Sequence, residues 1–179
     1  MEHKDIYILV NLLETPVDAL YASTVDAFPA TTKRQFSTDT VRVVKMSYVP
    51  FVKNKLLKVS TTISSKGKNY DVAVEFSDVV FHGTPSDNTL TIKASDQKDY
   101  HFSPIKASDN DVKVRCTCLD FHWRFAMWNY NDGSLIGMKP KLYKKKTDRP
   151  PVNPKRAPGM CKHIMKAIGY IQSQGMLVD

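Results

Sequence analysis

Glycine is scarce in this sequence, and this scarcity argues against a glycine-rich phosphate-binding loop. The 179 residues include seven glycines. Loops that cradle phosphate groups need several closely spaced glycines, because the backbone amides must approach the phosphate without a Cβ between them. The sequence has no such loop and no constellation of paired carboxylates. These absences argue against a nucleotide-binding or acid–base enzyme.

Long hydrophobic runs are absent as well. The apolar stretch at residues 6–13 is far shorter than the about 20 residues that a helix needs to cross a bilayer. The polar residues 1–5 before it do not resemble a secretory signal. Three cysteines, an odd number, favour a reducing compartment in which thiols bind metal and do not form disulfides. We therefore expect a cytoplasmic protein with no membrane partner.

The positive charge is confined to one part of the chain. Composition is ordinary for a soluble globular protein, with 42% hydrophobic and 25% charged residues, and the formal net charge is +8. Residues 139–166 contain ten basic side chains and one acidic side chain, so the rest of the chain is close to neutral. The length suits one domain or a domain with an appended module. A binding partner that is sensitive to charge would therefore meet residues 139–166.

The three cysteines form a pattern with one histidine. Cys116 and Cys118 are followed by forty-two residues and then by Cys161 and His163. Two short-spaced ligand pairs of this kind are typical of a closed tetrahedral Cys3His zinc site. The competing interpretation is three buried, inert thiols with His163 on the surface. We favour Zn²⁺ as the cofactor, because no cysteine is left outside the pattern.

The local patterns around the two pairs agree with a metal site. Residues 112–118 alternate apolar and polar, which predicts a strand that points both thiols to one face. After Pro158-Gly159, apolar residues recur at the helical period until Gly175. The second pair therefore opens a helix. Cys161 would lie in its first turn, where free backbone amides favour a thiolate.

Cys-x-Cys on a strand and Cys-x-His at the start of a helix resemble the SWIM-type zinc finger, over residues 112–172. The insert between the pairs is longer than in most SWIM modules. With Trp-Arg-Phe-Ala-Met-Trp at 123–128 and Arg-Pro-Pro-Val-Asn-Pro at 149–154, it resembles a variant found in tailed-bacteriophage proteins. The first resemblance implies DNA-binding or protein-interaction roles, and the second implies a virion protein assembled in the host cytoplasm.

The rest of the chain predicts an α+β fold with a β-rich antiparallel sheet or small barrel, a few helices and the C-terminal Cys3His module. Residues 1–13 are expected to form a strand or, as the alternative, a short buried helix. A helix is expected over 16–27, with Thr15 as its cap and Pro16 in its first position. Further strands are expected at 41–46, 57–62, 70–76, 89–93 and 100–102, with a hairpin at Lys66-Gly67-Lys68.

This pattern divides the chain into residues 1–110, a β-rich domain, and residues 111–179, the zinc module. The first part has its own alternating strands and nearly neutral charge, and the predicted ligands all lie beyond it. We therefore expect residues 1–110 to stay folded when the metal is removed.

The insert contains an aromatic segment and a basic, proline-rich arm. The spacing of Phe121, Phe125 and Trp128 predicts a short helix, which forms either the hydrophobic floor of the module or, less favourably, a base-stacking platform. Residues 139–158 contain five prolines and should form a stiff, extended arm.

Two kinds of partner remain open for this arm. Its candidate contact residues are Lys141, Leu142, Tyr143, Lys144, Lys145, Lys146, Arg149, Lys155 and Arg156. Apolar side chains among them favour docking on other virion proteins, as expected of a non-enzymatic structural subunit present in many copies. The lysines and arginines offer the alternative, DNA phosphates. An enzyme is the weakest interpretation, since four ligands close the zinc; it would need His122 as a ligand or base at an open site.

Overall fold

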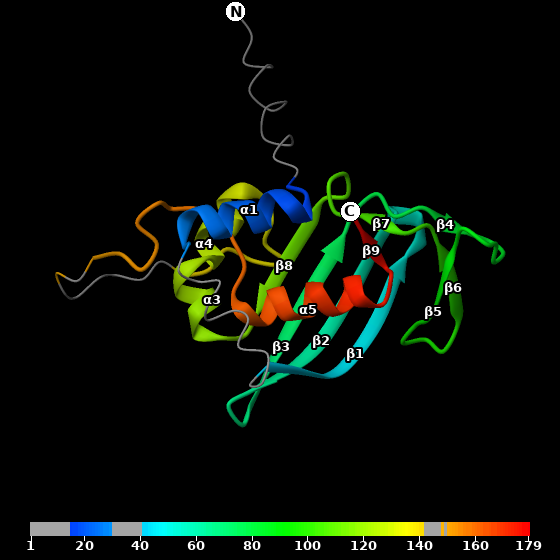
Figure 1. Ribbon diagram of the computed structural model, residues 1–179, viewed down its shortest axis with the longest axis horizontal. Coiled ribbons are helices and arrows are strands. Elements are labelled where there is room, and N and C mark those ends of the chain that lie inside the picture. The colour runs from blue at the N-terminus through cyan, green and yellow to red at the C-terminus, as the bar shows by residue number, and fades with distance from the viewer. Residues whose placement is uncertain (1–14, 30–40, 142–147, 149) are drawn as a thin grey trace, which may run out of the picture.

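A computed structural model describes residues 15–29, 41–141, 148 and 150–179. Figure 1 shows a curved sheet with α5 lying across one face and α1, α3 and α4 gathered at one end. The helices are α1 (Val17–Ala27), η3 (Val52–Asn54), α3 (Leu119–Arg124), α4 (Ala126–Asp132) and α5 (Lys162–Ser173). The strands are β1 (Val41–Phe51), β2 (Leu56–Ser65), β3 (Lys68–Phe76), β4 (Phe81–His82), β5 (Leu90–Lys93), β6 (Asp99–Phe102), β7 (Ile105–Lys106), β8 (Val112–Cys116) and β9 (Leu177–Val178).

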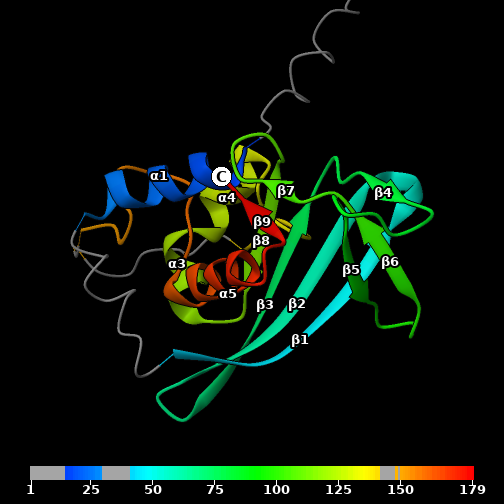
Figure 2. The same cartoon turned by 45° about the vertical axis from the view of Figure 1, so that its right-hand side comes forward.

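The main sheet is antiparallel, with strand order β1-β2-β3-β8. Side chains of β2 alternate strictly between buried and partly exposed positions, as expected of a strand with one face against a core. Helix α5 packs on that face against all four strands (Figure 2). Its buried stripe includes Ile164, Ile168 and Ile171, spaced at the helical period that the sequence predicts. The α+β prediction is confirmed.

The predicted hairpin at Lys66-Gly67 joins β2 to β3. Both residues have positive φ, 51° and 74°, which fits a two-residue turn whose twist matches that of the flanking strands. The apolar residues of β1 do not alternate cleanly near residue 44. A β-bulge between Val43 and Lys45 shifts the alternation at this point.

Two smaller sheets complete the described strands. One is antiparallel, with order β4-β6-β5, and the other is a parallel pair, β7 with β9. These sheets stay open, so within the described residues the strands form no closed barrel. The parallel pair was not predicted. It is made by the last strand of the chain, which follows α5 and lies beside Ile105.

The predicted helix over 16–27 is confirmed as α1, but its start differs in detail. Pro16 lies one position before the helix, as its N-cap residue. The Thr15 hydroxyl does not cap the helix and donates instead to the Asp132 carboxylate, at 2.8 Å. The backbone carbonyl of Thr15 accepts a hydrogen bond from the amide of Val112. The start of α1 is therefore tied to the start of β8 and to the end of α4.

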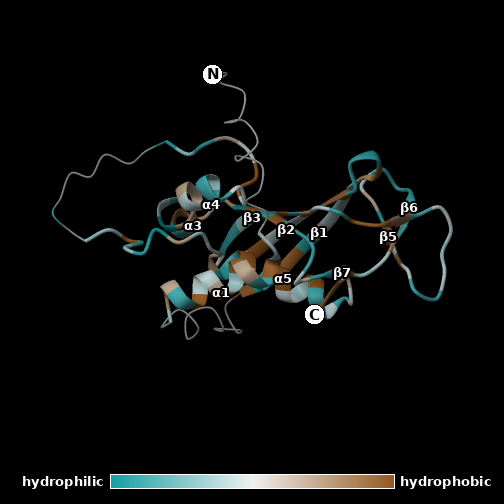
Figure 3. Cartoon of the chain, turned by 90° about the horizontal axis from the view of Figure 1, so that it is seen from above, coloured by the Kyte–Doolittle hydropathy of each residue, from teal (hydrophilic) through white to brown (hydrophobic). Residues whose placement is uncertain are grey.

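The hydrophobic core is one continuous cluster that includes residues from α1, β2, β3, β8 and α5. The predicted boundary at residue 110 precedes β8, which is paired with β3 in the main sheet. This packing favours one cooperative unit over a separable domain of residues 1–110. Figure 3 shows apolar residues concentrated where α5 meets the sheet.

The predicted strand over 1–13 lies outside the described residues. No helix in the described part of the chain is long and apolar enough to span a membrane.

Candidate metal centre

The first ligand pair stands at the end of β8. Cys116 is the last residue of this strand and is paired with Val72 of β3. The chain then continues along β3 for one residue, because Thr117 bonds to the backbone of Asp71 through its amide and its hydroxyl, both at 3.0 Å. Cys118 ends this extended segment and becomes the N-cap of α3. Both thiols are therefore held at the edge of a rigid sheet.

One backbone amide donates a hydrogen bond to each sulfur atom of this pair. The amide of Cys118 donates to Cys116 Sγ at 3.4 Å. The amide of Phe121 donates to Cys118 Sγ at 3.3 Å, which is the capping bond of α3. Hydrogen bonds from N–H groups stabilise a thiolate more than a thiol. Each of the two sulfur atoms therefore has one amide donor that favours its thiolate form.

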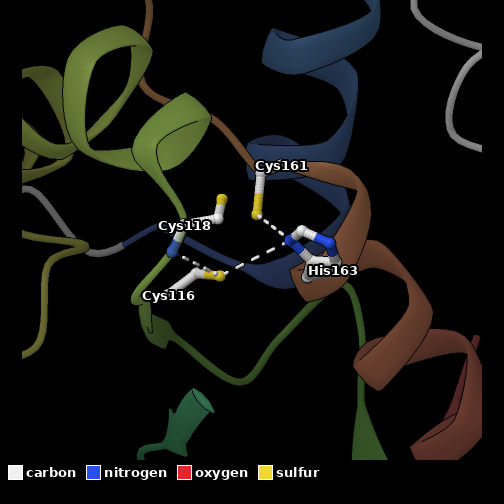
Figure 4. A group of neighbouring side chains, drawn as sticks. All are labelled: Cys116, Cys118, Cys161 and His163. Atoms are coloured by element: carbon white, nitrogen blue, oxygen red, sulfur yellow. Dashed lines mark hydrogen bonds between the residues drawn. The ribbon is translucent and has the colours of Figure 1, made fainter. Parts of the chain in front are cut away.

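The second pair is contributed by the start of α5. Cys161 is the N-cap residue of this helix and His163 lies in its first turn. His163 Nδ1 lies 3.8 Å from Cys116 Sγ and 4.0 Å from Cys161 Sγ (Figure 4). The four candidate ligand atoms all lie within 4.8 Å of one another. A tetrahedral zinc with bonds of about 2.0 to 2.3 Å requires ligand atoms about 3.5 to 3.8 Å apart, so a small contraction would complete the site.

All four side chains are buried, with exposed fractions of 5% or less. The His163 ring stacks on Tyr70 of β3, with centroids 4.2 Å apart. Its Nδ1 faces the three sulfur atoms (Figure 4), whereas its Nε2 is buried without a hydrogen-bond partner in the described part of the chain. The Cys3His group could therefore bind a metal ion through Nδ1, shielded from solvent.

The three thiols differ in their affinity for protons. The Cys116 thiol donates a hydrogen bond to Cys118, which holds the pKa of Cys118 far below its usual range. The same bond raises the pKa of Cys116 to about 12. Burial raises the pKa of Cys161 well above its ordinary value. Of the three thiols, Cys118 is therefore the one that loses its proton most readily.

Two buried polar residues hold the segment that leads into Cys161. Asn129 of α4 forms two bonds with Gly159: its Nδ2 donates to the carbonyl at 3.1 Å, and its Oδ1 accepts from the amide at 2.8 Å. The Thr24 hydroxyl of α1 accepts from the Met160 amide at 2.9 Å. A Cβ at position 159 would lie 2.7 Å from both Phe125 and Thr24. Glycine is therefore required for this close approach.

The sequence patterns did not mark Thr24 and Asn129 as support for the site. Both side chains are completely buried, yet a threonine in an amphipathic helix and an asparagine among aromatic residues are common surface patterns. Their partners lie 136 and 30 residues away in the chain. The one signal in the sequence was Pro158-Gly159, because a glycine beside a ligand indicates close packing.

The aromatic segment forms two short helices, α3 and α4, in place of one. Phe121 and Phe125 are each 1% exposed and belong to the core, as expected of a hydrophobic floor. Trp123 is 46% exposed. His122 does not join the candidate ligands in the described residues; its ring lies edge-on to Trp123, with centroids 4.4 Å apart.

The predicted arm is described in part. Leu142, Tyr143, Lys144, Lys145, Lys146 and Arg149 lie outside the described residues. Lys141 is exposed. Lys155 bonds to the carboxylate and the carbonyl of Asp26, both at 2.9 Å, and the Arg156 guanidinium lies 5.8 Å from the ring centroid of Trp128. Two of the predicted contact cations thus already contact groups of the protein.

Comparison of the chain with protein-family models, curated proteins and solved structures finds no match. The Cys3His geometry is consistent with a zinc module. The likeness to SWIM modules and to phage proteins stays a prediction from the motif.

Proposed function

We propose that this protein is a non-enzymatic, structural zinc-binding protein. The observation that carries the proposal is the buried Cys3His group, whose ligand atoms lie within 4.8 Å of one another. Three thiolates and one imidazole, close together, suit Zn²⁺. Hard cations such as Mg²⁺ and Ca²⁺ prefer oxygen ligands. Cys116, Cys118, Cys161 and His163 would hold the ion.

A structural role follows from the number and burial of the ligands. Four protein ligands complete a tetrahedral zinc and leave no position for water or substrate. Three thiolates with Zn²⁺ and neutral imidazole carry one net negative charge, which the amide donors at Cys116 and Cys118 and the N-terminus of α5 stabilise. The metal would fasten the start of α5 to the end of β8. It would thereby close the forty-two-residue insert.

Zinc binding is expected to release at least two protons per ion near neutral pH. The Cys116 pKa of about 12 and the raised Cys161 pKa mean that both thiols are protonated before the metal arrives. Since zinc then competes with two protons, its apparent affinity should fall about 100-fold for each unit by which the pH is lowered. Titration of reduced, metal-free protein with zinc, followed with a pH indicator, measures both the stoichiometry and the proton release.

His122→Ala is the matched control for His163→Ala in this titration. The first substitution removes a ring outside the cluster, so one zinc per chain should still bind tightly. The second removes a ligand and should weaken binding at least tenfold. Cobalt substitution should give the absorption of a tetrahedral thiolate site. Sub-stoichiometric zinc, or an octahedral cobalt spectrum, would contradict the proposal.

We further propose that the protein is a component of a tailed-phage virion, an adaptor or cement-like subunit that contacts other virion proteins. Support comes from the resemblance of the long insert to a variant found in phage proteins, and from the apolar side chains interspersed in the arm. Mass spectrometry and zinc analysis of purified particles test this proposal. Its absence from particles of a phage that expresses it would contradict it.

Nucleic-acid binding is the second candidate, favoured by the ten basic side chains between residues 139 and 166. If the arm docks on protein, Tyr143→Ala should impair assembly more than Lys144→Ala, because burying a ring is worth about 1.5 to 3 kcal/mol and is little screened by salt. We expect this ranking, with weak and sequence-independent DNA binding at physiological salt.

Measuring the affinity for duplex DNA at several salt concentrations tests the nucleic-acid alternative. Each phosphate neutralised by the arm contributes about −0.9 to the slope of log affinity against log salt, so six contacts give about −5. A slope this steep, together with a larger effect of Lys144→Ala than of Tyr143→Ala, would favour the nucleic-acid function.

A further inference from the structure

A depression lies on the main sheet, on the face away from α5. Its volume is about 340 Å³, within the range of small-ligand pockets. The helices lie on the other side of β1, β2 and β3 (Figure 2). Its floor is a row of side chains that crosses three strands: Ser47 of β1 lies opposite Ser60 of β2, and Ser60 lies opposite Ala73 of β3. The depression is therefore built on the paired strands of the sheet.

The floor consists of small side chains in the middle of three long strands. Cross-strand pairs of β-branched or aromatic residues stabilise a sheet more than pairs of serine or alanine do. The face that α5 covers has such pairs, including Val59 with Val74 and Ile63 with Tyr70. The row on the opposite face lacks this stabilisation and leaves open space between the longer side chains around it. Space of this kind suits a ligand that binds between those side chains.

Three basic side chains surround the floor. Arg115 of β8 is the next residue in the row, opposite Ala73. Lys45 of β1 and Lys58 of β2 stand two residues before the serines of the row, so they share their face of the sheet. All three line the depression together with one carboxylate, that of Asp71. Three cations against one carboxylate give the lining a net positive charge.

Two of these cations have no carboxylate partner among the described residues. Lys58 pairs with Glu75 at 3.6 Å. Lys45 and Arg115 form no ion pair in the described part of the chain. The Nη1 atom of Arg115 donates to the Ile136 carbonyl at 2.6 Å, which holds the guanidinium in place. The fork of N–H groups on a guanidinium matches the oxygen atoms of a phosphate, so an anion would compensate the charges that these residues leave unpaired.

We propose that this depression binds a compact ligand with two or more phosphate groups, of the pyrophosphate class. The cations supply the opposite charge, and the hydroxyl groups of Ser47 and Ser60 can donate to phosphate oxygens. The described lining residues include no aromatic side chain, so the site lacks both a platform for stacking nucleobases and the aromatic anchors typical of protein interfaces. The site is separate from the metal centre, because Arg115 is exposed and Cys116 is buried on the opposite face of β8.

Calorimetric titration of the zinc-loaded, full-length protein with pyrophosphate tests the site. We expect saturable binding of one pyrophosphate per chain. Lys45→Gln and Arg115→Gln should each weaken binding at least tenfold, because each removes a charged hydrogen-bond donor. Lys113→Gln is the matched control. It removes the same charge from the same strand, at an exposed position outside the depression, and should leave the affinity within twofold of wild type.

Further variants separate the shape of the site from its charge. Ala73→Leu fills the floor without changing the charge and should weaken binding at least tenfold, whereas Ala73→Ser should leave the affinity within twofold of wild type. A protein with Lys144, Lys145 and Lys146 all changed to Gln removes charge from the basic arm and should bind pyrophosphate as wild type does. ADP, which carries the same two phosphates on a nucleoside, should bind no more tightly than pyrophosphate, since no ring is available to stack on its base.

Several results would overturn the proposal. Failure to saturate at millimolar pyrophosphate would show that the depression is not a site for it. Equal losses in Arg115→Gln and Lys113→Gln would indicate general attraction to a positive surface, and a loss in the arm variant would place the ligand on the arm. Tighter binding of a single-stranded oligonucleotide or an acidic peptide, with the same dependence on Lys45, would assign this face to a macromolecule. Zinc content and melting profile, measured on the same samples, distinguish these results from a failure of the metal site.

Discussion

Cys161→Ser is expected to unfold the C-terminal part of the protein. Zinc contributes about 10 to 16 kcal/mol to the folding of small zinc modules, which equals or exceeds the total stability of about 5 to 15 kcal/mol typical of a domain. Cys161 is 1% exposed and sits where α5 begins. Without this thiolate, the proposed zinc link between the start of α5 and the end of β8 would be lost. Cys116→Ser should act in the same way from the other side.

Hydrogen exchange measured by mass spectrometry gives the extent of this unfolding. Fast exchange is expected in peptides from α3, α4 and α5 after the substitution, and equally after chelation of zinc from the wild-type protein. His122→Ala, which leaves the ligand group intact, should exchange as wild type does. Unchanged protection and an unchanged melting profile in the metal-free protein would contradict a structural role for the metal.

The same experiment decides how far the unfolding spreads. The sequence predicts that residues 1–110 remain protected on their own, whereas α5 covers the buried face of β1, β2 and β3 as well as β8. Exposing that face places Val59, Ile63 and Val74 in water, all of which are fully buried. We therefore expect protection of the sheet to fall together with that of α5. Retained protection in β1 to β3 would restore the two-part description.

Asn129→Asp is expected to destabilise the protein by about 3 to 5 kcal/mol. The substitution preserves the shape of the side chain but replaces its Nδ2 donor with an oxygen that faces the Gly159 carbonyl. Asn129 is completely buried, so the new carboxylate would lie uncompensated or take up a proton. Because Gly159 is two residues before Cys161, weaker zinc binding should accompany the loss. Chemical denaturation of the zinc-loaded protein measures the change in the free energy of unfolding.

Asn131→Asp is the control on the same helix. It makes the same chemical change two residues later, at an exposed position, and should alter stability by less than about 0.5 kcal/mol. Similar effects of the two substitutions would show that the change in charge alone matters. The difference between the two losses of unfolding free energy measures the contribution of the paired hydrogen bonds that position Gly159.

Local patterns in the sequence predicted the features that depend on neighbouring residues. The alternation over 70–76, the turn at Lys66-Gly67 and the helical period after Cys161 each specify an element directly, and each element is present. The proximity of Cys116, Cys118, Cys161 and His163 followed from ligand chemistry, since scarce residues placed in two tight pairs match the corners of a tetrahedral metal site.

Features that depend on distant contacts were not predictable in this way. The β7–β9 pair joins residues about seventy positions apart. Each strand has two residues, too few to show an alternation of apolar and polar side chains in the sequence. The bonds of Asn129 and Thr24 depend on where the insert returns to the core. The same holds for the placement of β8 in the main sheet, because a strand with one buried face has the same pattern beside any partner.

The position of the ligands along the chain sets an order of events during synthesis. Cys118 is made forty-three residues before Cys161, a delay of about 2 to 9 s at ribosomal rates of about 5 to 20 residues per second. Throughout that interval the inner face of the sheet has no α5 to cover it, and two thiols await their partners. If zinc closes the site as proposed, the chain needs free zinc at the moment α5 emerges, and zinc-starved cells should accumulate the protein as aggregates.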